Sequence, residues 1–125
     1  MSIRKIAVVG ATGAVGRMML EVLSEQDWLD SSIQIELYAS ARSKGVKLPF
    51  REQFLSVLEY SAETVARCDY ILMSAGATFS RQEVPKLLVH GASIIDNSSA
   101  WRMEPEVPLI VPEVNSHLIP KISRG

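Results

Sequence analysis

Three glycines lie at regular spacing near the N-terminus, in the segment Gly10-Ala11-Thr12-Gly13-Ala14-Val15-Gly16. The first can turn the chain sharply, the second lets an anionic group approach the backbone, and the third lets a helix pack close to a strand. A helix that begins here would offer free amide donors and a partial positive charge to phosphate groups. The spacing is GxxGxxG rather than the commoner GxGxxG, so the string alone is also compatible with a plain tight turn.

The residues on either side of the glycine turn favour the phosphate-binding interpretation. Ile3 to Val9 is an apolar run that ends in a glycine, which predicts a strand. Ala14 to Glu25 predicts a helix, because its apolar residues recur at helical spacing. We expect these residues to form one buried stripe: Val15, Met18, Met19, Val22 and Leu23. A strand, a glycine turn and an amphipathic helix in this order predict a dinucleotide-binding site that includes Gly10, Gly13 and Gly16.

The end of the second predicted strand, Ile33 to Ala39, bears on which nicotinamide nucleotide binds. In NAD enzymes an acid at this point usually bonds the ribose 2′-hydroxyl, and Glu36 lies about 20 residues past the glycines. Glu36, however, sits in the middle of the strand, which is followed by Ser40-Ala41-Arg42-Ser43-Lys44. A guanidinium fork and short hydroxyl donors suit a 2′-phosphate, which a carboxylate would repel. Ser40, Arg42 and Ser43 therefore favour NADP; the alternative is a solvated loop.

Two later loops carry small and polar residues directly after predicted strands. Tyr70 to Ser74 is apolar almost throughout, as expected of a strand covered on both faces, and it leads into Ser74-Ala75-Gly76. The next strand, Ser93 to Asp96, leads into Asn97-Ser98-Ser99-Ala100-Trp101-Arg102. In an open parallel sheet, ligands bind outside the carboxyl ends of the strands. We expect the cofactor to lie on the small residues and Arg102 to bind an anionic ligand; the alternative is a hydrogen-bonded turn with an exposed arginine.

The remaining segments predict a single α/β domain over residues 1–125. A short strand is expected over 54–58, a helical turn over 62–66 and a further strand over 109–111. Ser80 is expected to cap a helix that runs through Val89, with Glu83 at the capping-box position and Gly91 as the stop. Strands and helices that alternate with short loops predict a doubly wound, Rossmann-type, mostly parallel sheet with helices on both faces.

Composition excludes several classes of protein. The net charge is −1, with acids and bases interspersed, so nothing favours nucleic acid or an anionic membrane as a partner. The longest apolar runs have the length of strands, and the N-terminus runs directly into one, which argues against a transmembrane helix or a signal peptide and predicts a cytoplasmic protein. The one cysteine, Cys68, precedes a strand at the edge opposite the binding loops, so we interpret it as structural. No metal-ligand spacing occurs.

Five segments, in this order and spacing, resemble the N-terminal part of bacterial aspartate-β-semialdehyde dehydrogenases: GATGAVG at 10–16, ASARSKG at 39–45, SAG at 74–76, IDNSSAWRM at 95–103 and VPLIVPEVN at 107–115. The resemblance implies NADPH-dependent reduction of β-aspartyl phosphate to aspartate semialdehyde and phosphate, on the route to lysine, threonine and methionine. It implies cofactor contacts from Thr12, Gly13, Ala14 and Val15. It also implies that Ser40, Arg42 and Ser43 hold the 2′-phosphate, and that Arg102, with Asn97 nearby, holds the substrate phosphate.

The sequence departs from the family pattern in three ways. Trp101 stands where phenylalanine is common, and Ala77 replaces a frequent glycine. The chain also ends before the segment in which the family carries its cysteine nucleophile, its acid/base histidine and the second domain that makes most of the dimer interface. We therefore expect the NADP-binding domain of a homo-oligomeric enzyme, inactive by itself. The alternatives are a short nucleotide-binding paralogue without catalysis and a domain like that of N-acetyl-glutamyl-phosphate reductase, a sister family.

Overall fold

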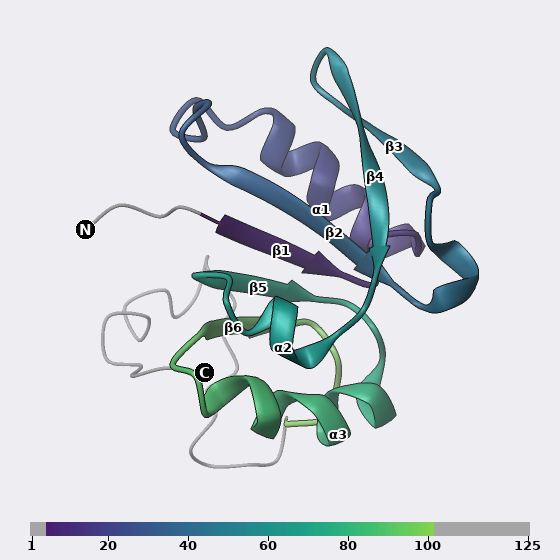
Figure 1. Cartoon of the computed structure of the whole chain (residues 1–125), viewed down its shortest axis with the longest axis vertical. Helices are drawn as coiled ribbons and strands as arrows, with labels where there is room; N and C mark the ends of the chain where they lie inside the picture. The colour runs from purple at the N-terminus through teal and green to yellow at the C-terminus, as the bar shows by residue number, and fades with distance from the viewer. Residues whose placement is uncertain (1–4, 102–125) are drawn as a thin grey trace.

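The computed structural model describes residues 5–101 of the chain. Their elements follow in the order β1 (Lys5–Val9), α1 (Ala14–Ser24), β2 (Gln34–Ala39), the 3-10 helix η1 (Ala41–Ser43), β3 (Lys47–Phe50), β4 (Gln53–Glu59), α2 (Ala62–Val65), β5 (Tyr70–Met73), α3 (Ala77–Leu88) and β6 (Ser93–Asp96). Within this range the strands form one sheet in the order β3-β4-β2-β1-β5-β6 (Figure 1). Every pairing is parallel except that of β3 with β4. The prediction of a doubly wound, mostly parallel sheet is confirmed.

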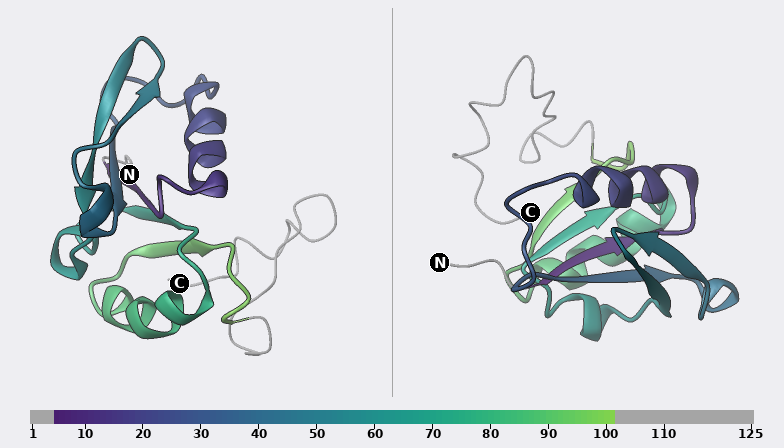
Figure 2. Two further views of the ribbon diagram at one scale, coloured as in Figure 1. Left: turned by 90° about the vertical axis from the view of Figure 1, so that its right-hand side faces the viewer. Right: turned by 90° about the horizontal axis from the view of Figure 1, so that it is seen from above.

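Helices cover both faces of the sheet (Figure 2). On one face, Leu20 and Leu23 of α1 pack in a core cluster with Val8 of β1. On the other face, Leu87 of α3 packs in a second cluster with Val9. Successive strand residues point to opposite faces, so the four residues of β1 after Lys5 must all be apolar to serve both clusters. No helix within residues 5–101 is long and apolar enough to cross a membrane.

The buried face of α1 differs from the predicted stripe. Three predicted core residues are largely exposed: Val15 at 43%, Met18 at 64% and Val22 at 50%. Leu23 is buried as predicted, but it is joined by Gly16 and Leu20. Gly16 sets the rotation of the helix, because a Cβ at this position would lie 2.1 Å from the carbonyl oxygen of Gly10. Leu20 and Leu23, four and seven positions after Gly16, then face the sheet, because they lie on the same side of the helix as Gly16.

Helix α3 begins four residues earlier than predicted, because its N-cap is Gly76 and not Ser80. Gly76, with a φ of +92°, precedes its first residue, and the Ser80 amide donates to the Gly76 carbonyl at 3.0 Å. The positive φ lets the chain enter the helix directly after β5. Ser80 is therefore a fully buried helix residue and not a cap, and Glu83 accepts a hydrogen bond from the Tyr60 hydroxyl instead of forming a capping box.

The strand β3 was not predicted, and its turn into β4 carries a residue that braces α1. Arg51, with a φ of +56°, occupies this turn. Its guanidinium donates to three backbone carbonyls at and after the end of α1: those of Ser24 at 3.1 Å, Gln26 at 2.8 Å and Leu29 at 2.6 Å. The last carbonyls of a helix have no partner within the helix, so a cation with several donors is favourable there.

We expect Arg51→Ala to lower the free energy of unfolding by about 2 kcal/mol, because three carbonyls lose charged donors at a partly exposed site. Arg51→Ala keeps the strain of a Cβ at a φ of +56° and therefore isolates the guanidinium, whereas Arg51→Gly also relieves that strain and should lose less stability. Urea unfolding followed by circular dichroism measures both variants. An unchanged unfolding midpoint in Arg51→Ala would show that these hydrogen bonds contribute nothing to stability.

Candidate nucleotide-binding site

The glycine turn joins the C-terminal end of β1 to the first turn of α1. Gly10 has a φ of +84°, and its amide donates to the Tyr38 carbonyl at 2.9 Å. A Cβ on Gly10 would lie 2.8 Å from the carbonyl oxygen of Ser74, so only glycine fits between the ends of β2 and β5. Gly13 precedes α1, and no side chain caps the helix. The first amides of α1 therefore remain available to an anion, as phosphate binding requires.

The predicted 2′-phosphate segment lies beside this turn. Ser40 immediately follows β2, and Arg42 and Ser43 lie in η1. The hydroxyl oxygens of Thr12 and Ser43 are 3.4 Å apart. The structure therefore brings together the two groups of residues that the sequence assigned to different phosphates of one cofactor.

The loops after β5 and β6 reach the same edge of the sheet, because both strands run parallel to β1 (Figure 1). Ser74, the first residue after β5, donates its backbone amide to the Val9 carbonyl at 3.0 Å. Its hydroxyl lies 3.3 Å from the same carbonyl oxygen. Ala75 and Gly76 continue this loop into α3. The small residues after β5 thus border the glycine turn.

Asp96, the last residue of β6, organises the loop that follows it. Its carboxylate accepts hydrogen bonds from the amide of Ser98 at 2.9 Å and from the hydroxyl of Ser98 at 3.0 Å. The amide of Asn97 donates to the Met73 carbonyl at 3.1 Å, which ties the start of this loop to the end of β5. Arg102, the predicted anion-binding residue, lies outside the described residues, as does the predicted strand over 109–111.

Ser80 connects this loop to α3. The Trp101 indole N–H donates to the Ser80 hydroxyl oxygen at 2.8 Å, and the Ser80 hydroxyl donates to the Asp96 carboxylate. Ser80 is fully buried, and both of its hydrogen bonds are at least partly buried. Ser80, which the sequence suggested as a helix cap, therefore connects the loop after β6 to α3.

We expect Ser80→Ala to lower the free energy of unfolding by about 2 kcal/mol, because it leaves the partly buried indole N–H without its acceptor and removes a donor to Asp96. Trp101→Phe keeps an aromatic ring and the Ser80–Asp96 bond, so we expect a loss of about 1 kcal/mol. Tyr60→Phe, which removes a 2.9 Å hydrogen bond to Glu83 elsewhere on α3, is the matched control. Urea unfolding compares the three variants. A smaller loss for Ser80→Ala than for Trp101→Phe would contradict this interpretation of the network.

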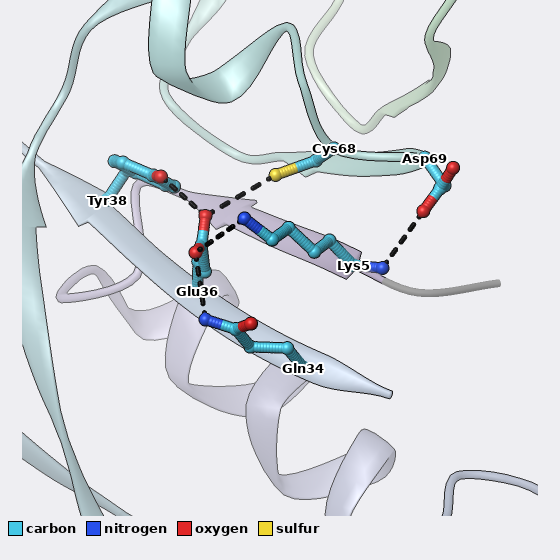
Figure 3. A network of polar contacts seen from close by, with 6 residues as sticks. All are labelled: Lys5, Gln34, Glu36, Tyr38, Cys68 and Asp69. Carbon is cyan, nitrogen blue, oxygen red and sulfur yellow. Dashed lines mark hydrogen bonds and ion pairs between the residues drawn. The ribbon is translucent and has the colours of Figure 1, made fainter. Parts of the chain in front are cut away.

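Glu36, the candidate acid for a ribose 2′-hydroxyl, is bound elsewhere (Figure 3). Its carboxylate accepts hydrogen bonds from the Tyr38 hydroxyl at 2.7 Å and from the Gln34 side-chain amide at 3.0 Å. The Lys5 ammonium lies 3.5 Å away, and the Cys68 thiol 3.6 Å away. Lys5 begins β1 and Cys68 precedes β5, so this network extends toward the edge of the sheet opposite the glycine turn.

The Cys68 thiol is buried beside this carboxylate. Burial, followed by the negative charge of Glu36, raises the pKa of Cys68 to about 12. Burial also raises the pKa of Tyr38, and its hydrogen bond to Glu36 adds to the shift. The thiolate is the nucleophilic form of cysteine, so Cys68 has the environment of an unreactive structural thiol.

These shifts predict a loss of stability in alkali. The folded-state pKa of Cys68 lies above its ordinary value of 9.0, so its stabilising contribution is complete below pH 9.0 and disappears as the pH rises through about 12. Urea midpoints measured across this range should fall with pH, and by less in Cys68→Ala. The native thiol should also react slowly with a thiol reagent. Reaction at the rate of the urea-unfolded chain would contradict its burial.

One basic residue of this site was not predicted. Arg17, in the first turns of α1, donates from its Nε to the Thr12 carbonyl at 2.9 Å. Its guanidinium therefore lies at the glycine turn. Helical periodicity marks Arg17 only as a polar position, and gives no indication that the side chain folds back toward the turn.

Together, the parallel sheet, the uncapped helix after a glycine turn and the adjoining basic segment define a Rossmann-type nucleotide-binding domain. The family described as semialdehyde dehydrogenase, NAD binding domain, matches residues 5–122, and the chain belongs to this family. It is 46% identical over 112 residues to an aspartate-semialdehyde dehydrogenase of Aquifex aeolicus, a match that covers 89% of this chain and 32% of that protein. The resemblance drawn from the five sequence segments is confirmed.

Solved structures agree with this assignment. An aspartate semialdehyde dehydrogenase II of Vibrio cholerae, crystallised in complex with ASA, matches with a TM-score of 0.83 and 34% identity, covering 96% of this chain and 39% of that one. An aspartate semialdehyde dehydrogenase of Candida albicans, crystallised with NADP, matches with a TM-score of 0.77 and 31% identity, covering 94% and 36%. The chain spans about one third of the length of the curated relatives it matches.

Proposed function

We propose that the chain is the NADP-binding domain of an aspartate-semialdehyde dehydrogenase, which reduces β-aspartyl phosphate with NADPH to aspartate semialdehyde and phosphate. The observation that carries this proposal is the 3.4 Å contact between the Thr12 and Ser43 hydroxyls. It joins the glycine turn to a basic, hydroxyl-rich segment in a chain of the semialdehyde dehydrogenase family. An enzyme of this name from Candida albicans was crystallised with NADP.

The residues present fit this cofactor. The free amides at the start of α1 would bind the pyrophosphate, with contacts from Thr12, Ala14 and Val15. Ser40, Arg42 and Ser43 would bind the 2′-phosphate, and the cofactor would lie on the backbone of Ser74-Ala75-Gly76. Bound NADPH supplies the hydride. Glu36 supports a preference for NADP over NAD. Its carboxylate binds the Tyr38 hydroxyl and the Lys5 ammonium, so it is not free to bond a ribose 2′-hydroxyl.

For the substrate, we assign the phosphate group to Arg102, with Asn97 in the same loop. The family reaction requires a thiolate that takes the acyl group from phosphate and forms a thioester. Cys68, the one cysteine of the sequence, is buried with a raised pKa and does not suit this role. We therefore expect these 125 residues to bind NADPH without turning over substrate.

The substrate assignment can be tested in a chimera. Residues 5–122 replace the matching domain of the Aquifex aeolicus enzyme, and NADPH formation from aspartate semialdehyde, phosphate and NADP is measured by absorbance. We expect turnover by the chimera, strong loss of turnover in Arg102→Ala with NADPH binding retained, and no turnover by the isolated chain above a mock preparation. A folded chimera that binds NADPH but acts only on N-acetyl-glutamyl semialdehyde, or on neither substrate, would refute the assignment. So would activity of the isolated chain.

The assignment to this enzyme carries further proposals that rest on the family alone. The complete protein would act in the cytoplasm, on the route to lysine, threonine and methionine, and would form a homodimer. Size-exclusion chromatography with light scattering of the complete protein tests the last of these. A monomer that turns over substrate would refute the dimer.

A further inference from the structure

We propose that Arg17 is a second arginine for the cofactor 2′-phosphate, acting together with Arg42. This inference rests on the proposed function, because it concerns the same cofactor. The resemblance assigns no role to Arg17, and its position within α1 does not by itself suggest one.

The first observation is the direction of the Arg17 side chain. Its Nε donates to the Thr12 carbonyl at 2.9 Å, so the side chain folds back along α1 toward the glycine turn. Thr12 in turn approaches the predicted 2′-phosphate segment, because its hydroxyl lies 3.4 Å from that of Ser43. Thr12 thus connects Arg17 on one side with Ser43 on the other. The guanidinium is therefore held at the residue of the glycine turn whose hydroxyl meets the predicted 2′-phosphate segment.

The second observation is that this positive charge is not neutralised. The ion pairs among residues 5–101 are Lys5 with Glu36 and Lys86 with Glu83, so neither Arg17 nor Arg42 has a carboxylate partner there. The first turn of α1 contains no acidic residue. With Nε used, the terminal nitrogens of Arg17 still carry four N–H donors. The candidate anion site thus combines two arginines with free donors, a pair of hydroxyls and the positive end of a helix. Its positive charge exceeds what a pyrophosphate alone requires.

The arrangement favours the 2′-phosphate over the pyrophosphate as the ligand of Arg17. The free backbone amides at the start of α1 can bind the pyrophosphate without help from a side chain. Arg17 is held at Thr12, the residue of the turn that contacts Ser43. A terminal phosphate carries a charge close to −2 and has three free oxygens, so it suits two guanidinium groups that approach from different elements.

The test compares NADPH and NADH binding by fluorescence titration of the 125-residue chain and its variants. Arg17→Ala should weaken NADPH binding by about tenfold and NADH binding by less than about twofold, because only NADPH has the 2′-phosphate. Arg17→Lys should recover most of the loss, since a charge remains. Arg81→Ala removes one positive charge from an exposed position of α3 and should change neither Kd. Urea unfolding confirms that each variant is folded.

The outcomes separate this inference from the function on which it rests. If Arg17→Ala weakened NADPH binding and NADH binding equally, Arg17 would only stabilise the turn through the Thr12 carbonyl. This result would overturn the inference. A preference of the unmodified chain for NADPH that is undiminished in Arg17→Ala would overturn the inference alone. Equal binding of NADPH and NADH by the unmodified chain would overturn both the inference and the proposed cofactor.

Discussion

Gly16→Ala is expected to abolish NADPH binding and to lower the free energy of unfolding by about 3 kcal/mol or more. A Cβ at this position would lie 2.1 Å from the Gly10 carbonyl oxygen and 2.8 Å from the Ala11 Cα. Both neighbours are backbone atoms, and the amides of Gly10 and Ala11 donate to the Tyr38 carbonyl at 2.9 and 3.1 Å. The turn cannot move away from a methyl group without breaking its connection to β2, so α1 must tilt from the sheet and take its amides with it.

Gly13→Ala is the matched control for this prediction. Gly13 has a φ of −75°, and its nearest non-neighbouring atom would be the Gly10 carbonyl oxygen at 3.6 Å, an ordinary contact. We expect this variant to keep nearly the unfolding midpoint of the parent chain, while its methyl group obstructs the approach of the pyrophosphate. Urea unfolding and NADPH fluorescence are measured for both variants. A Gly16→Ala chain as stable as Gly13→Ala would contradict the close approach of α1 to the turn.

The second large effect is expected from Arg42→Ala, which should weaken NADPH binding by about 30-fold and leave NADH binding within about twofold. Arg42 is exposed in η1 and has no ion pair among residues 5–101, so its removal should not affect folding. Its guanidinium is therefore available to bind a 2′-phosphate through two parallel hydrogen bonds.

Lys44→Ala serves as the control for Arg42→Ala, since it removes a positive charge two residues further along the same exposed segment. We expect its effect on NADPH to be much smaller, because a single ammonium on a flexible stem gives no bidentate contact. The measurement is a fluorescence titration at one fixed salt concentration. Equal losses of NADPH and NADH affinity in Arg42→Ala would remove the 2′-phosphate assignment.

Features of the fold that depend on neighbouring residues in the chain could be predicted from the sequence. The strand over Ser93 to Asp96 has the predicted bounds, and α1 ends one residue before the predicted end. The rotation of α1 could not be predicted, because it is set by contact of Gly16 with Gly10 across the turn and not by the pattern of apolar residues. The strand β3 was missed for a similar reason: its four residues alternate in burial only because the hairpin folds back over the core.

The candidate site shows the same division. Residues at strand ends could be expected to gather, because parallel strands bring their carboxyl ends to one edge, and the Thr12–Ser43 contact agrees with this. The directions of long side chains could not be derived from spacing. Arg17 folds toward the turn through one hydrogen bond, and Ser80 faces Trp101 from a helix that begins four residues before its predicted start. The substrate residue Arg102 remains a prediction.

The central claim is that the glycine turn and the segment after β2 bind NADP as one site. Its most direct test is a fluorescence titration of the unmodified chain with NADPH and with NADH, followed by competition with adenosine 2′,5′-bisphosphate and with 5′-AMP. We predict that NADPH binds at least about tenfold more tightly than NADH, and that only the bisphosphate displaces it at low concentration. NADH binding as tight as NADPH, or displacement of NADPH by both competitors alike, would contradict the claim.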